Sequence, residues 1–345
     1  MKATNLISYL EFCMLNSIQF CITGRPGIGK TQIVKQVAKK LNYKCIISHP
    51  VVSDPTDYKG LPWIVEGKAK FIPFSDLEQI LENNSQSELS WPGVEDSYVP
   101  SEEDEKILFF FDDLGQAPIS VQAAIMQLIE NRKLNNHSVK KNVVFGAATN
   151  RKEDKAGVGA FIEPLKSRFS IVELEATVND WVQWALAQPN IPVEFIGAVR
   201  FRPDWIEEWS PSQGIENTPN PRNIEEAAKF ISLPAELRFE GFKSRLGRAA
   251  ATELCAFLEI FTKLPSVSDI VSSPRSCPMV SEPSQKLALI SALTRRADFE
   301  NISAVALYIK RYGMEWLSLF MNDISVKNKK LTETPTYAEW AVNNY

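Results

Sequence analysis

An eight-residue segment near the start of the chain restricts the possible folds more than any other part of the sequence. Residues 24–31 read GRPGIGKT and match the pattern G-x-x-x-x-G-K-[ST]. Glycines let the backbone curl tightly, so that successive N–H groups converge on phosphate oxygens. A helix that begins at such a loop points its positive end at the same anion. The segment therefore predicts a phosphate-binding loop made of Gly24, Arg25, Pro26, Gly27, Ile28, Gly29, Lys30 and Thr31.

The flanking residues have the periodicity that such a loop requires. Residues 17–23 form a short apolar run rich in strand formers, and residues 31–41 carry their apolar side chains on one helical face. Within the loop, Lys30 is placed to reach the β- and γ-phosphates, and Thr31 is placed to hold Mg²⁺. ATP and Mg²⁺ are the predicted ligands. GTP stays open, because the loop reads phosphates and not the base.

A second apolar run ends in two acidic residues. Residues 107–111, ILFFF, are typical of a buried parallel strand, and Asp112 and Asp113 follow directly. In open α/β sheets ligands lie at the carboxyl ends of the strands. We therefore expect Asp112 in the Mg²⁺ shell and Asp113 as the base that orients the attacking water. The alternative is an acidic turn after a core strand.

Strands alternate with helices up to residue 174, after which the chain becomes helical. Expected strands at 142–147 and 171–174 and an expected helix at 120–131 favour an α/β fold with a parallel sheet flanked by helices. An amphipathic helix is expected at 246–261. We predict an α/β nucleotide-binding domain over 1–175, an all-α lid over 176–232 and a helical C-terminal region over 233–345.

The composition narrows the class of protein. Five cysteines without a CxxC pair and only two histidines predict neither a zinc site nor a disulfide framework. The longest apolar runs fall short of the roughly 18 residues of a membrane span, so we expect no membrane partner and a cytoplasmic protein. A net charge of −4 gives no electrostatic footprint for nucleic acid.

Over roughly residues 15–230 the chain resembles the AAA+ ATPases and, within them, the MoxR-like group. The segment 112–118, DDLGQAP, followed by VQAA at 121–124, resembles the family's stretch after the acidic strand. Residues 53–62, SDPTDYKGLP, resemble the loop before a helix-2 insert, expected around 60–75, and a pre-sensor-1 hairpin is expected around 132–143. The resemblance implies a P-loop AAA+ core followed by an all-α lid.

The resemblance also implies roles for three single residues. Asn150, at the end of a buried strand, resembles sensor 1, Arg168 resembles the arginine finger, and Arg222 resembles sensor 2. Each has a structural alternative: Asn150 as a turn or cap residue, Arg168 as an arginine paired with Glu163 or Glu173, and Arg222 as a plain helix N-terminal arginine. Lys166 is the second candidate for the finger. Asp113 departs from the glutamate of many relatives, and its shorter reach bears on the hydrolysis rate.

Three functions follow from these residues. The first is an ATP hydrolase that forms a homo-hexamer, as a ring or a helical assembly, and remodels a protein partner. The resemblance implies a chaperone-like role and a partner with a von Willebrand factor A-type domain. The second is a nucleotide-switched oligomeric assembly protein with little turnover. The third is a nucleic-acid motor or loader, for which the sequence shows no basic run.

Overall fold

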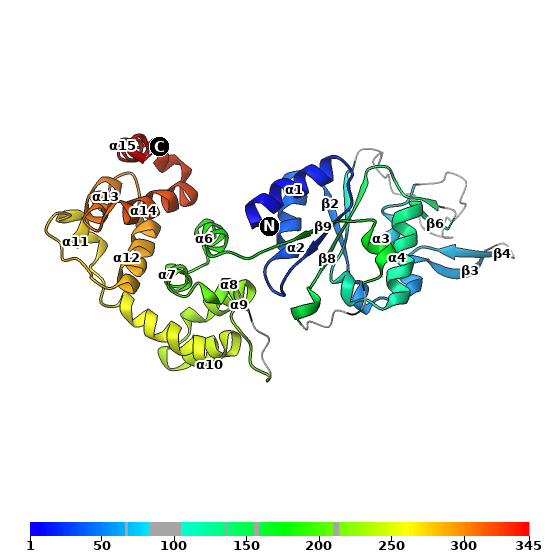
Figure 1. Cartoon of the computed structure of the whole chain (residues 1–345), viewed down its shortest axis with the longest axis horizontal. Coiled ribbons are helices and arrows are strands. Elements are labelled where there is room, and N and C mark those ends of the chain that lie inside the picture. Colours follow the sequence, from blue (N-terminus) through cyan, green and yellow to red (C-terminus); the bar gives the residue numbers. More distant parts are fainter. Residues whose placement is uncertain are drawn as a thin grey trace, which may run out of the picture. The chain divides into compact units, whose positions relative to one another are not determined.

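The computed structural model describes residues 1–65, 68–82, 105–135, 137–154, 159, 161–209 and 214–344. The chain divides into two compact units, Met1–Glu175 and Ala176–Tyr345 (Figure 1). Each unit is built around its own apolar cores.

Five parallel strands form the central sheet of the first unit, in the order β2-β5-β8-β1-β9. They are β1 (Phe20–Thr23), β2 (Lys44–Ser48), β5 (Ile107–Phe111), β8 (Val143–Thr149) and β9 (Ser170–Glu173). The predicted parallel sheet is confirmed. Strand β1 begins later than residue 17, because Ser17 has a φ of 55° and the Ile18 N–H caps the preceding helix by donating to the Cys13 carbonyl, 2.9 Å away.

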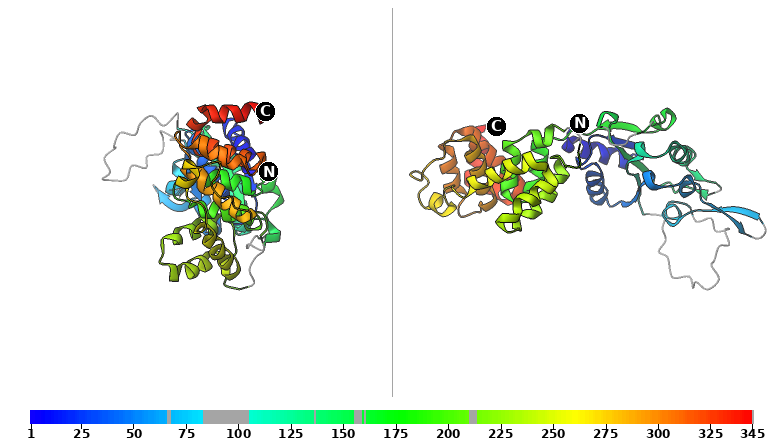
Figure 2. Two further views of the ribbon diagram at one scale, coloured as in Figure 1. Left: turned by 90° about the vertical axis from the view of Figure 1, so that its left-hand side faces the viewer. Right: turned by 90° about the horizontal axis from the view of Figure 1, so that it is seen from below.

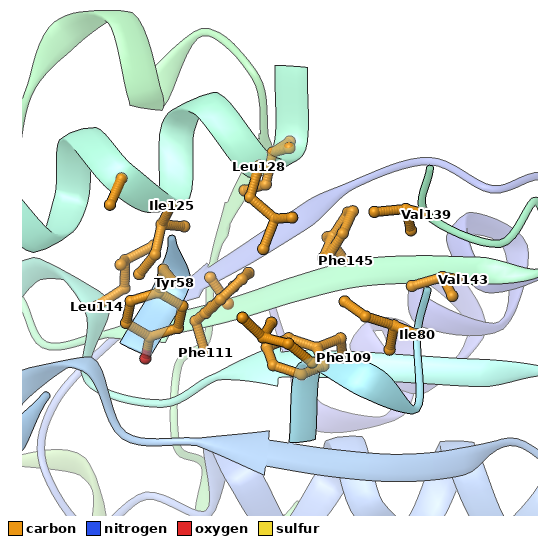
Figure 3. Close-up of a cluster of buried hydrophobic side chains, with 14 of the residues drawn as sticks. Tyr58, Ile80, Phe109, Phe111, Leu114, Ile125, Leu128, Val139, Val143 and Phe145 are labelled. Atoms are coloured by element: carbon orange, nitrogen blue, oxygen red, sulfur yellow. The ribbon is translucent and has the colours of Figure 1, made fainter. Parts of the chain in front are cut away.

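Helices cover both faces of this sheet. One face packs against α1 (Ala3–Leu15) and α2 (Lys30–Lys40), and the other against α3 (Ser75–Glu78), α4 (Ile119–Asn131) and α5 (Glu163–Lys166). Strand β5 contributes to both faces. Its Leu108 and Phe110 join the core on the α1–α2 side. Its Phe109 and Phe111 join Phe145 on the α4 side, where Figure 3 shows them below that helix. Burying one such side chain stabilises the fold by about 1.5–3 kcal/mol. The apolar run before Asp112 is therefore anchored on two sides.

Two short hairpins complete the first unit. They are β3 (Leu61–Val65) with β4 (Lys68–Ile72), and β6 (Lys133–Leu134) with β7 (His137–Ser138). The β3–β4 hairpin extends away from the sheet in both views that show it from the side (Figures 1 and 2). Its turn at residues 66–67 lies outside the described residues, as does most of the acidic segment 83–105.

The second unit is helical. Its helices are α6 (Val178–Ala187), α7 (Val193–Phe201), α8 (Asp204–Glu207), α9 (Pro221–Ala228), α10 (Ala235–Phe261), α11 (Val267–Ser272), α12 (Pro283–Arg296), α13 (Ile302–Lys310), α14 (Met314–Lys327) and α15 (Pro335–Asn344). One core joins α6–α9 to α10, and a second joins α11–α15. Residues 176–232 thus share a core with α10, and a lid that ends at residue 232 stays a prediction.

Helix α10 begins earlier than the sequence predicted. The apolar periodicity is strong only from residue 246, whereas the helix starts at Ala235 directly after Pro234. At Gly247 the backbone leaves the helical region, with φ 78° and ψ 168°. A Cβ at this position would lie 2.6 Å from the Asn217 carbonyl oxygen, so only glycine fits. Among the helices that the structure describes, none is long and apolar enough to cross a membrane.

Candidate nucleotide-binding site

The predicted phosphate-binding loop joins β1 to α2. Gly27 and Gly29 have φ values of 74° and 95°, which glycine adopts without strain. A Cβ on Gly24 would lie 2.8 Å from the Leu174 carbonyl oxygen, so this position admits no side chain. Gly29 is the N-cap of α2, whose first-turn N–H groups have no intrahelical partner. Backbone N–H groups therefore gather at one point, as binding of phosphate oxygens requires.

The Lys30 side chain lies inside the loop and is only 7% exposed. Its Nζ donates hydrogen bonds to the Gly24 carbonyl at 2.8 Å, to the Arg25 carbonyl at 2.9 Å and to Asn150 Oδ1 at 2.7 Å. These contacts link the loop after β1 to the end of β8, the strand beside it in the sheet. The ammonium group is thus fixed at the carboxyl edge of the sheet.

Thr31 and Asp112 form the second contact across this edge. Thr31 Oγ1 donates to Asp112 Oδ2 over 2.8 Å. A hydroxyl oxygen next to a carboxylate oxygen is the donor set that Mg²⁺ accepts, since this ion binds one or two carboxylates and completes its shell with waters and substrate phosphates. The residues that the structure describes contain no group of three or more His, Cys, Asp and Glu that could hold a metal by itself. The pair fits a magnesium ion that arrives with a nucleotide.

Asn150 connects the lysine to the second acidic residue. Its Nδ2 donates to Asp113 Oδ1 at 3.2 Å, while its Oδ1 accepts from Lys30. A donor on one side and an acceptor on the other fix the orientation of the amide. Asp113 has a left-handed backbone, with φ 57° and ψ 34°, which aspartate tolerates better than most residues. Five predicted residues from three strand ends therefore form two hydrogen-bonded groups at one edge of the sheet.

Arg168 lies apart from this network, in the turn between α5 and β9. Its guanidinium forms an ion pair with Glu130 Oε1 at 2.5 Å and donates to the Pro164 carbonyl at 2.6 Å. The two glutamates that the sequence offered as structural partners bind other cations: Glu163 pairs with Lys166 and Glu173 with Arg151. The expected alternative pairing is wrong, because the real partner is on α4, far from Arg168 in sequence.

Comparison with known proteins identifies this unit. Residues 19–180 match the family model of the AAA domain (dynein-related subfamily). These residues form an AAA+ domain. The match starts just before β1 and includes the phosphate-binding loop, both aspartates, Asn150 and Arg168. It covers the first unit from residue 19 onwards, so the superfamily assignment rests on the same residues as the site.

Other comparisons add little to the AAA+ assignment. Three solved structures of Thermotoga maritima RuvB variants are similar to the chain at 14%, 14% and 15% identity, with TM-scores of 0.35, 0.36 and 0.34. Each alignment covers 99% of this chain and 86% of the other. At these TM-scores the superpositions carry no argument about function. No curated protein sequence matches the chain.

The AAA+ domain contains one polar cluster that the sequence analysis missed. Arg151 Nη2 and Nε donate to the Asp154 carboxylate at 2.7 and 2.9 Å, and Nη1 donates to Glu173 at 3.0 Å. The hydrogen bonds to Asp154, followed by those to Glu173, raise the pKa of Arg151 above its ordinary value. Because β8 and β9 flank β1, this arginine ties together the two strand ends beside the phosphate-binding loop. In the sequence, Asp154 at three residues after Arg151 was the signal from which this cluster could have been predicted.

Cys21 in β1 is completely buried, and burial raises the pKa of its thiol to about 12, with the Lys30 ammonium acting in the opposite direction.

Arg222 lies in the second unit, in the first turn of α9. The N-cap of this helix is Asn220, whose side chain accepts from the Asn223 N–H at 2.9 Å. Its role as sensor 2 stays a prediction.

Proposed function

We propose that this chain is an ATP hydrolase of the MoxR-like AAA+ type, whose active site is completed by a second copy of the chain. The observation that carries the proposal is the hydrogen-bonded chain from Lys30 through Asn150 to Asp113, with Thr31 bound to Asp112 beside it. It places a cation, an amide and two carboxylates at one edge of a parallel sheet, next to a phosphate-binding loop.

Each residue of this network has a chemical task. The loop N–H groups and Lys30 bind the β- and γ-phosphates, and Thr31 with Asp112 holds Mg²⁺, which neutralises phosphate charge when bound. Asp113 accepts the proton of the attacking water, and Asn150 orients that water against the γ-phosphate. The Asn150–Asp113 hydrogen bond keeps the carboxylate oxygen in the position from which it accepts this proton.

Arg168 is the residue that requires a second subunit. Among the residues described, its hydrogen bonds and its ion pair stay within α4 and α5 and include none to the network of its own subunit. A guanidinium at the surface end of a strand reaches the nucleotide of a neighbouring copy, where neutralising the transferred phosphoryl group raises the rate about 10³–10⁵-fold. We propose a homo-hexamer, as a ring or a helical assembly, with Arg222 coupling turnover to movement of the helical region.

The finer assignment comes from the resemblance described above. We propose that the assembly works in the cytoplasm and remodels a protein partner, in the manner of the MoxR-like group, and that this partner carries a von Willebrand factor A-type domain. The opposite expectation, a nucleotide switch with little turnover, draws on Asp113, whose carboxylate is one methylene shorter than that of glutamate and is held by Asn150.

The test is Mg²⁺-dependent ATPase activity per subunit as a function of protein concentration. We expect specific activity to rise with concentration and to fall at least about 10³-fold in Arg168→Ala. Lys166→Ala is the comparison variant, because Lys166 is the second candidate for the finger and also pairs with a glutamate, Glu163, at 2.5 Å. It keeps the parent activity if Arg168 is the finger. Flat specific activity together with an unaffected Arg168→Ala protein would refute the shared site. Stable assemblies with negligible turnover would favour the switch.

A further inference from the structure

Gln122 is a completely buried polar residue in the first turns of α4. Its side-chain Nε2 donates to the Ala117 carbonyl at 3.0 Å, and its Oε1 accepts from the Ile162 N–H at 3.1 Å. Val121 and Ile125 on the same helix belong to the apolar core on the α4 side of the sheet. A buried amide in such surroundings is retained only where its hydrogen bonds are made.

The two backbone groups that Gln122 joins lie near two parts of the proposed active site, namely the acidic pair and Arg168. Ala117 ends the short 3-10 helix Leu114–Gln116, which follows Asp113 directly. Ile162 is the N-cap of α5, and its carbonyl accepts from both Leu165 and Lys166. The start of α5, and with it the turn that carries Arg168, is therefore attached through one side chain to the segment after the acidic pair.

Two further contacts hold the residues on either side of α5. The Gly159 N–H donates to the Gly115 carbonyl at 3.1 Å, and Glu130 in the last turn of α4 pairs with Arg168. Helix α4 thus holds the segment at two places, through Gln122 near its start and through Glu130 near its end. The Glu130 contact involves an exposed carboxylate, whereas the Gln122 contact lies in the core and is shielded from water.

We infer that Gln122 is a positioning residue for Arg168: it sets the height and direction of α5, so that the guanidinium meets the nucleotide of the neighbouring subunit. This inference rests on the proposed function, since it assigns Gln122 a role in presenting the trans-acting arginine. When Gln122 Oε1 is removed, the Ile162 N–H loses this acceptor and the N-cap of α5 is released. A shift of the arginine by about 1 Å then lowers turnover about 10²-fold, without altering binding of the nucleotide in the subunit's own loop.

The experiment compares Gln122→Met with Gln127→Met in the full-length chain. Methionine at 122 keeps the volume and removes the hydrogen bonds to Ala117 and Ile162, while Gln127 lies on the exposed face of the same helix and serves as the control. We expect kcat to fall about 10²-fold in Gln122→Met, with KM and the nucleotide dissociation constant within twofold of the parent. Gln127→Met keeps the parent kcat.

Mixing subunits separates a positioning role from a structural one. Lys30→Ala subunits bind no nucleotide but carry an intact Gln122 and Arg168. Added to Gln122→Met subunits, they supply a correctly positioned arginine to a site that still binds ATP, so turnover recovers. Arg168→Ala subunits mixed with Lys30→Ala subunits recover turnover in the same way. Unchanged kcat in Gln122→Met, or a loss that Lys30→Ala subunits do not restore, overturns the inference.

A second variant covers the case in which Gln122→Met does not fold. Ile162→Pro removes the N–H that donates to Gln122 Oε1 and keeps the bond to Ala117, and the Ile162 φ of −64° suits proline. We expect kcat to fall about 10²-fold, with intact nucleotide binding and with recovery on mixing with Lys30→Ala subunits. An unchanged kcat, or a loss that mixing does not restore, overturns the inference. If Arg168→Ala itself retains full activity, the proposed function fails, whatever Gln122 does.

Discussion

A buried ion pair in the second unit gives a sharp stability prediction. Arg200 on α7 and Asp323 on α14 are joined by an Nη2–Oδ1 contact of 2.6 Å, with side-chain exposures of 10% and 8%. Arg200 Nη1 and Asp323 Oδ2 are both buried without a hydrogen-bond partner among the described residues. Burial raises the pKa of Asp323 above its usual range, against the opposing effect of Arg200. The pair is therefore only partly satisfied.

The change to make is Arg200→Met, alone and with Asp323→Leu. Removing one partner leaves an uncompensated buried carboxylate, which lowers the free energy of unfolding by about 3–5 kcal/mol. The double variant removes both charges and the two unpaired atoms with them. It should match the parent or exceed it by about 1–4 kcal/mol. The sign of the double variant is the informative result.

Urea unfolding followed by tryptophan fluorescence measures the effect. Six of the eight tryptophans belong to the second unit, namely Trp181, Trp184, Trp205, Trp209, Trp316 and Trp340. With a slope of about 1–3 kcal/mol per molar urea, the single variant shifts the midpoint down by about 1 M or more. A midpoint within experimental error of the parent, or a double variant weaker than the single one, would refute the reasoning.

The pH dependence has a definite sign. Without Arg200 the pKa of Asp323 rises further, because the neighbouring charge that lowers it is gone. A raised folded-state pKa stabilises the fold below the unfolded pKa, and this contribution is lost as the pH rises through the folded value. The deficit of Arg200→Met is therefore largest at neutral pH and shrinks towards acid. A deficit that grows on acidification would contradict the assignment of the buried charge.

Three other predictions concern the nucleotide-binding unit. Gly29→Ala and, in the second unit, Gly313→Ala both place a side chain at positive φ without a clash, so each should lower the free energy of unfolding by about 1–3 kcal/mol. Only Gly29→Ala should weaken nucleotide binding. Equal nucleotide affinities of the two variants would argue against the phosphate-binding loop. Asp112→Asn keeps an acceptor for Thr31 and loses the charge, so the Mg²⁺-dependent part of nucleotide affinity, measured by calorimetry, should fall about 10–100-fold; an unchanged Mg²⁺ effect would exclude Asp112 from the metal shell. A protein that retains only Cys21 should resist alkylation at about pH 8 until it unfolds, because its thiol pKa is about 12; rapid native labelling would contradict its burial.

The sequence predicted which residues meet at this edge of the sheet, for a simple reason. The loop, the apolar run before Asp112 and the strand before Asn150 are local patterns, and a parallel sheet brings strand ends to one edge. The structure accordingly joins Lys30, Thr31, Asp112, Asp113 and Asn150, while their roles in hydrolysis stay predictions.

Long-range pairings and backbone breaks were not accessible in this way. Arg168 pairs with Glu130, and periodicity within one segment says nothing about which of several glutamates a distant arginine meets. The start of α10 was missed, because apolar and charged residues alternate over 235–240, directly after the N-cap Pro234. The break at Gly247 depends on the Asn217 carbonyl that crosses there, which is a tertiary contact.

The contacts of Lys30 have a consequence for ligand selectivity. Its ammonium group already donates to two carbonyls of its own loop and to Asn150. An incoming anion therefore has to replace hydrogen bonds that the ammonium group already makes. The net gain in binding free energy is small for each bond that is exchanged in this way. A polyphosphate that meets many loop N–H groups at once outweighs that exchange. A single inorganic sulfate or phosphate does not, so such ions should be poor competitors for this loop.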